Sequence, residues 1–265
     1  MERKPNVMNT PILFYREGTC ALGSMIALEA LNEPYRLVRL EHGENDGENY
    51  LRINPLGEVP TLIDSNGVLT ESLAILQHIG SNAIEHGLSF PQRTAKYDRL
   101  NQILSYLVTS YHKAYAPIFG AKAFHPDPQV QNEVKRTVTE GNLRDQLRFI
   151  DQYLLNEHPY FFENFTVADA YFYGTGRWAK NFFDLEKEFS NIARFFENME
   201  REEVVRSAVA IEEGRVKDAK GAFQGHVSLE SLISTDEPLF PGIRRAPSKD
   251  VASETTKPVS GISRM

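Results

Sequence analysis

The spacing of apolar residues changes partway along the chain. Residues 11–15 and 35–40 form short apolar or alternating runs, which predict strands because they are too short for helices. Between them, from Cys20 onward, apolar residues recur at helical spacing. A hairpin over residues 61–69 follows, and Glu71 opens a second amphipathic helix. This alternation of strands and helices predicts a compact α/β unit.

Beyond residue 93 the strand signals stop and the helical period continues alone. Apolar residues recur at helical spacing over residues 97–119, 129–155, 191–201 and 204–214. The run Thr166-Val167-Ala168-Asp169 is a capping box with Asp in place of Glu, and it predicts a helix that continues through Trp178. Together these segments indicate an all-helical bundle.

After Lys217 the composition changes, because Gly, Ser, Pro and charged residues dominate and only short apolar islands remain. Such a composition predicts a mostly disordered tail. The resulting segments are an N-terminal extension at 1–10, the α/β unit at 11–81, a linker at 82–93, the all-helical domain at 94–217 and the tail at 218–265. A chain of 265 residues is long enough for two domains with cores of their own.

Composition and charge exclude several classes of function. A net charge of −7 without a Lys/Arg cluster argues against a nucleic-acid partner or an anionic membrane surface. No apolar run approaches the ~20 residues of a membrane span, and residues 1–10 have no signal-peptide core. The single cysteine excludes an intramolecular disulfide framework and a multi-cysteine metal site, and no metal is expected. A reducing cytoplasm is the expected compartment.

The segment from Val59 to Ser72 carries the first candidate chemistry. Pro60 cannot donate to a sheet, and a cis bond before it leaves the N–H and C=O of Val59 free to pair with an extended peptide. At the next helix start, the Ser72 hydroxyl can hold a carboxylate and the Glu71 carboxylate an ammonium. The alternative is an ordinary hairpin followed by a capped helix. Local chemistry alone favours that alternative.

Cys20 and the pair His112-Lys113 are the other candidates. At the start of a helix, Cys20 is placed where the macrodipole favours a thiolate, but free cysteines are also among the most buried residue types. Its position alone does not decide between these interpretations. In isolation, His112 and Lys113 are typical of a solvated helix face.

Three motifs near residues 54–75 carry a resemblance to a known family. They are Asn-Pro-x-Gly-x-Val-Pro-x-Leu, an Asp-x-x-Gly turn and Glu-Ser-x-Ala-Ile. This combination resembles the thioredoxin-like half of the glutathione transferase superfamily. The resemblance implies that Val59, Glu71 and Ser72 hold the backbone and the γ-glutamyl end of glutathione.

The start of the chain is similar to the bacterial beta class of that superfamily. Tyr15 followed by Gly18-x-Cys20 resembles its glutathione sulfur site, where the cysteine can bond covalently to glutathione. Tyr15 would correspond to the family's N-terminal tyrosine, although a core aromatic at a strand end is the preferred interpretation. The string that contains His112 and Lys113 also resembles this class and implies that both face the glutathione site. An imidazole or ammonium near Cys20 would favour its thiolate.

Other motifs complete the resemblance. The Thr166/Asp169 box is the superfamily's structural capping box, and Trp178, the sole tryptophan, is expected in the core.

The acidic loop with Glu41 and Glu44 is a departure, because the beta class usually offers a lysine there to the glycyl carboxylate of glutathione. Glu17 and Ala21 replace the Pro and Ser common beside the cysteine, and the tail after Lys217 has no counterpart.

The resemblance therefore implies a thioredoxin-like domain followed by a helical bundle, in a cytoplasmic homodimer that conjugates glutathione to small hydrophobic electrophiles in detoxification. The implied catalytic residues are Cys20, His112 and Tyr15, and the implied glutathione-binding residues are Val59, Glu71, Ser72, His112 and Lys113. One alternative is a thiol–disulfide oxidoreductase that forms a mixed disulfide at Cys20. Another is a non-catalytic binding module.

Overall fold

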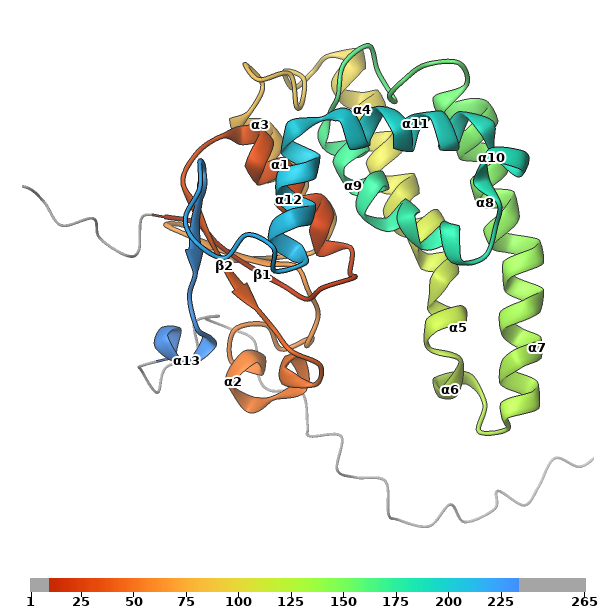
Figure 1. Ribbon diagram of the computed structural model, residues 1–265, viewed down its shortest axis with the longest axis horizontal. Coiled ribbons are helices and arrows are strands. Elements are labelled where there is room, and N and C mark those ends of the chain that lie inside the picture. The colour runs from red at the N-terminus through yellow and green to blue at the C-terminus, as the bar shows by residue number, and fades with distance from the viewer. Residues whose placement is uncertain (1–9, 234–265) are drawn as a thin grey trace, which may run out of the picture.

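The computed structural model describes residues 10–233. An α/β unit lies on one side of the molecule and a helical bundle on the other, with α1, α3 and α12 between them (Figure 1). The predicted combination of a thioredoxin-like domain with an all-helical domain is confirmed. No helix within residues 10–233 is both long and apolar enough to cross a membrane.

The sheet has strands from both ends of the described chain. They are β1 (Ile12–Tyr15), β2 (Tyr35–Arg39), β3 (Thr61–Asp64), β4 (Gly67–Thr70) and β5 (Phe223–His226), in the order β4-β3-β1-β2-β5. β1 and β2 are parallel, β3 is antiparallel to β1 and β4, and β5 is parallel to β2. The hairpin of β3 and β4 lies where the turn chemistry predicts it.

Successive residues of β1 point to opposite faces of the sheet and so belong to two different cores. Leu13 and Tyr15 join the large core that α1 (Ala21–Leu31) and α3 (Ser72–Asn82) share with the bundle. Ile12 and Phe14 join a smaller core on the other face. That face is covered by α2 (Glu48–Leu51) and by α13 (Leu229–Leu232) (Figure 1). A 3₁₀ turn at Glu44–Asp46 precedes α2.

The bundle follows residue 94 and contains several short or irregular helices. Its helices are α4 (Ala95–Tyr106), α5 (Ala116–Phe119), α6 (Ala121–Phe124), α7 (Pro128–Val138), α8 (Arg144–Phe149), α9 (Val167–Gly176), α10 (Leu185–Glu188), α11 (Ser190–Arg201) and α12 (Glu203–Glu212). π-helical turns occupy Leu107–Tyr111, Thr139–Leu143 and Ile150–Leu155, and 3₁₀ turns occupy His112–Tyr115 and Arg177–Asn181. The predicted capping box closes the start of α9, where Asp169 accepts from the backbone N–H of Thr166 at 2.8 Å.

Helices α1 and α9 meet without room for side chains at their crossing. A Cβ added to Gly23 would lie 2.8 Å from the Cα of Tyr171, and one added to Gly174 would lie 2.7 Å from the backbone N of Gly23. Both glycines are therefore required by the close approach of the two backbones. This contact fixes the start of α1 against the middle of the bundle.

The prediction that the chain from residue 218 is mostly disordered is wrong for residues 218–233. β5 pairs with β2, and Phe223 is fully buried against Tyr35 with ring centroids 5.9 Å apart. Four residues that complete an existing sheet need no long apolar pattern of their own, so periodicity does not reveal them. The rest of the expected tail, 234–265, and most of the expected N-terminal extension, 1–9, lie outside the described residues.

Phe223→Ala should lower the free energy of unfolding by about 3–5 kcal/mol, because it removes a buried aromatic ring and leaves a cavity. Phe124→Ala is the matched control, since that ring is 60% exposed and its loss should cost far less. Urea unfolding of both variants measures the difference. Equal stability of the two variants would contradict the integration of β5 into the core.

Candidate functional site

The thiol of Cys20 lies where three segments of the α/β unit meet. Cys20 is the residue before α1, and its Sγ donates to the carbonyl oxygen of Val59 at 3.6 Å. The hydroxyl of Ser72, the first residue of α3, donates to the same sulfur at 3.7 Å. The structure thus brings together three of the residues that the sequence singled out.

Buried polar side chains hold the turn before Val59. The Val59–Pro60 peptide bond is cis. Asn54 donates to the carbonyl of Glu58 at 2.8 Å and to the hydroxyl of Thr61 at 3.1 Å. The hydroxyl of Tyr50 donates to the same Glu58 carbonyl at 2.6 Å. The backbone on both sides of Val59 is therefore fixed, so a peptide ligand meets a preformed edge.

Glu71 and Ser72 form the start of α3. Glu71 has a positive φ of 68° and an exposed side chain, and its carbonyl accepts the first helical bond from Ile75 at 3.0 Å. The first N–H groups of a helix have no partner within it, so a carboxylate is favoured at this point. A carboxylate, a hydroxyl and a helix N-terminus at one place can hold an α-amino acid group through both its charges.

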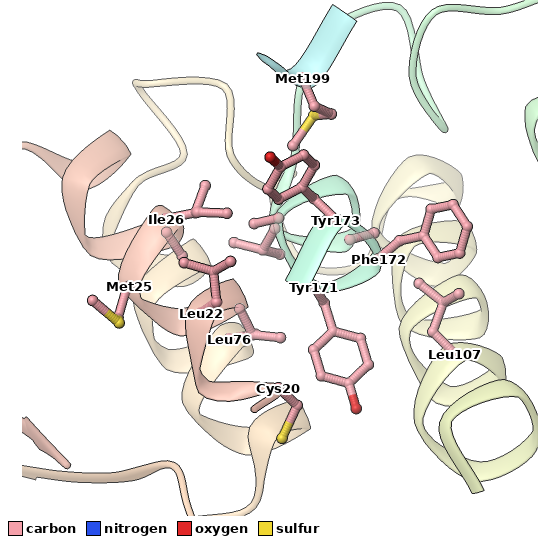
Figure 2. Close-up of a cluster of buried hydrophobic side chains, with 14 of the residues drawn as sticks. Cys20, Leu22, Met25, Ile26, Leu76, Leu107, Tyr171, Phe172, Tyr173 and Met199 are labelled. Carbon is pink, nitrogen blue, oxygen red and sulfur yellow. The ribbon is translucent and has the colours of Figure 1, made fainter. Parts of the chain in front are cut away.

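Tyr171 of α9 connects this group to His112, and sequence reasoning missed it. Its hydroxyl lies 2.6 Å from Nδ1 of His112. Burial raises the pKa of Tyr171 well above its ordinary value, a thiolate at Cys20 and the carboxylate of Glu71 raise it further, and the Ser72 hydroxyl opposes them. Figure 2 shows the hydroxyl and the Cys20 sulfur on the same side of the α1–α9 contact. Every residue of α9 is buried, so the sequence pattern gave no signal that one of them is functional.

His112 is neutral near pH 7. Burial, and then the charge of Lys113, lower the pKa of His112 to about 4. Burial therefore opposes the expected imidazolium beside a Cys20 thiolate, because it disfavours the charged ring. Lys113 is exposed beside His112. A π-helical turn, Leu107–Tyr111, directly precedes His112, and such turns are frequent at functional sites.

Burial likewise opposes the thiolate that the sequence predicts at Cys20. Burial raises the pKa of the Cys20 thiol to about 11, and the Ser72 hydroxyl offsets only part of this effect. Glu58 raises the pKa further, and Arg177 lowers it slightly. The helix start favours a thiolate only where the sulfur stays hydrated, and here its residue is 8% exposed. Sequence position could not reveal that burial.

Tyr15 does not direct its hydroxyl at Cys20. Its side chain is fully buried, and the hydroxyl is bonded to Nε2 of His226 in β5 at 2.9 Å. Burial raises the pKa of Tyr15 to about 12. The partner comes from a segment whose structure the sequence did not predict. Tyr15 thus belongs to the interior of the sheet rather than to the Cys20 group.

An aromatic surface lies beside His112. The ring centroid of Trp178 is 5.1 Å from that of His112 and 5.2 Å from that of Tyr115. Phe119 stacks on Tyr115 at 5.3 Å and remains 59% exposed. Trp178 is half-buried and packs against the edge of the large core rather than inside it. Its indole N–H reaches the loop before Cys20. An apolar molecule could stack on this surface next to the site.

Comparisons with known proteins agree with this geometry. Residues 12–81 match the glutathione S-transferase N-terminal domain. Glutathione S-transferase GstA of Escherichia coli O157:H7 is 30% identical over 204 residues, which cover 76% of this chain and 98% of that protein. A sphingomonad glutathione S-transferase complexed with glutathione is 28% identical, with a TM-score of 0.68 over 76% of this chain and 98% of that one.

A beta-class enzyme is also among the similar structures. The beta-class glutathione S-transferase of Sphingomonas chungbukensis is 27% identical, with a TM-score of 0.67 over 76% of this chain and 98% of that one. The chain belongs to the glutathione S-transferase family of transferases, near its beta class. About a quarter of the chain lies outside these alignments.

Alkylation of Cys20 should be slow at pH 7 and should accelerate about tenfold per pH unit up to pH 10, because only the thiolate reacts. A rise in pKa from 9.0 to about 11 makes the folded protein about a hundredfold less reactive than the urea-unfolded chain at pH 7. Iodoacetamide labelling followed by mass spectrometry measures both rates. Equal rates at pH 7 would show that the folded thiol is not held neutral.

Proposed function

We propose that this protein conjugates glutathione to small electrophiles. One observation carries the proposal: the Cys20 sulfur lies 3.6 Å from the Val59 carbonyl oxygen and 3.7 Å from the Ser72 hydroxyl. Cys20 and Ser72 lie at the starts of two helices, α1 and α3. Glutathione is an extended peptide with an α-amino acid group at one end and a thiol in the middle. The arrangement offers a matching group for each of these parts.

Glutathione would lie along the cis-Pro turn. Its cysteinyl backbone pairs with Val59, as an added strand pairs with a sheet edge. Its γ-glutamyl group lies at the start of α3, with the ammonium on Glu71 and the carboxylate on Ser72 and the helix N-terminus. Its sulfur then lies near Cys20. The sphingomonad structure with bound glutathione supports this ligand.

Arg16 is the cation that we assign to the glycyl carboxylate of glutathione. It lies in the loop before Cys20 and donates to Oδ1 of Asn45 at 3.0 Å. Asn45 in turn donates to the carbonyl of Gly57 at 2.9 Å, which places Arg16 beside the segment that leads to Val59. A guanidinium bonded to the acidic loop through Asn45 offsets the repulsion that Glu41 and Glu44 would exert on a carboxylate.

The chemistry rests on neutral hydrogen-bond donors. The Cys20 thiol and the imidazole of His112 are uncharged at pH 7, so neither adds charge repulsion toward an anion. The single proton of the thiol would turn from the Val59 carbonyl to the anion, and the carbonyl would pair with the backbone of glutathione instead. Bound glutathione releases its thiol proton to solvent, and its thiolate electron pair forms the bond to the electrophilic carbon. The leaving group departs with the electron pair of the bond it breaks. Tyr171 positions His112 through Nδ1.

The electrophile would lie on the aromatic surface of Trp178, Tyr115 and Phe119. These rings border His112, and Phe119 has 59% of its surface free for an apolar partner. Stacked aromatic substrates gain energy from such a surface beyond simple area burial. The proposed substrates are therefore small and hydrophobic, consistent with a detoxifying role in a reducing cytoplasm.

The homodimer also belongs to this proposal. Phe149 and Tyr153 stack at 5.5 Å on the outer side of the bundle, and Tyr153 is 69% exposed. Large exposed aromatics at one place are typical of protein interfaces. Light scattering of the purified protein would distinguish a dimer from a monomer.

Thiol–disulfide exchange at Cys20 is the second candidate, because the same sulfur lies at the proposed glutathione site. Exchange requires a thiolate as the attacking group, and burial disfavours that form here. A binding module without catalysis is the third alternative. The neutral state of Cys20 favours conjugation, in which the attacking sulfur belongs to glutathione.

Glu71→Ala should raise the dissociation constant of glutathione about tenfold to a hundredfold, since a charge-assisted hydrogen bond is worth roughly 1.5–3 kcal/mol. Glu85→Ala is the matched control, because Glu85 is an exposed carboxylate in the linker just beyond the end of α3. Calorimetric titration with glutathione measures both. Unchanged affinity in a folded Glu71→Ala protein would remove Glu71 from the site.

Cys20→Ala should keep part of the conjugation activity, because the nucleophile is the sulfur of glutathione and other donors remain. It should abolish any mixed disulfide with glutathione. Turnover of a model aryl halide and intact-protein mass spectrometry after incubation with oxidised glutathione test the two statements. Complete loss of conjugation together with an abundant wild-type adduct at Cys20 would favour the oxidoreductase instead.

A further inference from the structure

The backbone of the two residues before Cys20 is held by side chains of the helical domain. The backbone N–H of Gly18 donates to Oε1 of Glu212 at 3.1 Å, and its carbonyl accepts from the indole N–H of Trp178 at 2.9 Å. The carbonyl of Thr19 accepts from the guanidinium of Arg177 at 3.2 Å. Residues more than 150 positions away in sequence thus fix the loop.

Arg177 and Glu212 form one rigid unit. The guanidinium contacts the carboxylate through two parallel bonds of 2.6 and 2.7 Å. The side chain of Glu212 is 1% exposed, and Nε of Arg177 donates to the carbonyl of Gly174 at 3.1 Å. A bidentate pair of this kind has little freedom to shift. We call Arg177, Trp178 and Glu212 the loop clamp.

Stability alone does not account for the loop clamp. A buried ion pair often contributes no more than apolar residues of the same size, because both charges lose their hydration. The start of α1 is already fixed by its contact with α9 at Gly23 and Gly174. Apart from the bond of Arg177 to Gly174, the other bonds of the clamp go to the two residues directly before Cys20.

We propose that the loop clamp positions the Cys20 thiol, and with it the sulfur of bound glutathione, relative to the electrophile. Trp178 belongs both to the loop clamp and to the aromatic surface. Its indole N–H donates to the Gly18 carbonyl, and its ring centroid lies 5.1 Å from that of His112. The helical domain thereby sets the distance between the sulfur and the aromatic surface. Arg177, Trp178 and Glu212 are positioning residues, and the statement about glutathione rests on the proposed function.

The test uses two variants of the clamp and two controls. Arg177→Met with Glu212→Leu replaces the ion pair by apolar residues and removes its bonds to Gly18 and Thr19. Trp178→Phe removes the bond to the Gly18 carbonyl and keeps a smaller aromatic ring beside His112. Thr166→Ala destabilises the bundle through its capping box without touching the loop. Glu200→Gln breaks an exposed ion pair with Lys180 in the same domain.

The double variant should alkylate Cys20 about tenfold faster than the wild type at pH 7, because the loop opens locally rather than with the whole protein. Trp178→Phe should accelerate the alkylation of Cys20 about threefold. If the double variant fails to fold, the rate of this milder variant tests the role of the clamp. In conjugation, kcat should fall about tenfold or more with a smaller change in the KM for glutathione, since misplacement affects the reacting atoms. Both controls should react like the wild type.

Alkylation that stays at the wild-type rate in folded clamp variants would overturn the inference. So would equal acceleration by Thr166→Ala, because the rate would then follow global stability. The labelling experiment uses no glutathione, so it is independent of the proposed function. If the wild type fails to bind glutathione while the clamp variants still expose Cys20, the proposed function fails and the positioning of Cys20 stands.

Discussion

The close approach of α1 to α9 is the contact on which the site depends. At the crossing, neither Gly23 nor Gly174 can carry a Cβ without meeting backbone at 2.8 or 2.7 Å. Since α1 begins directly after Cys20 and α9 contains Tyr171, the contact brings the thiol of one domain to the hydroxyl of the other (Figure 2). Through Tyr171 it also brings His112 to the site. A wider crossing would separate the groups that the proposed chemistry needs together.

Burial then decides the charge of each group in the site. It raises the pKa of Cys20 to about 11 and lowers that of His112 to about 4, so both are neutral over the physiological range. A neutral thiol and a neutral imidazole can donate hydrogen bonds, but they neither attack nor repel an incoming anion. This balance favours a site in which the charge is brought by the ligand. It also explains why a lone cysteine at a helix start need not be a reactive one.

The sequence predicts local features of the site better than its long-range ones. The turn before Val59, the start of α3 at Ser72 and the helix after Cys20 each follow from signals within a few residues, and the structure places them together. The Tyr171–His112 bond, the loop clamp and the pairing of β5 join segments far apart in the chain, and no periodic pattern marks them. The charge states of Cys20 and His112 also lie beyond local sequence signals, because they depend on burial that only the folded chain creates.

In the proposed reaction, the sulfur of glutathione carries the negative charge while Cys20 stays protonated. Carbon-13 NMR of glutathione labelled at its cysteinyl Cβ, bound to the wild-type protein at pH 7, tests this most directly. We expect a Cβ shift typical of a thiolate, and the same shift with the Glu200→Gln control. A shift typical of a neutral thiol, or of a disulfide to Cys20, would contradict it.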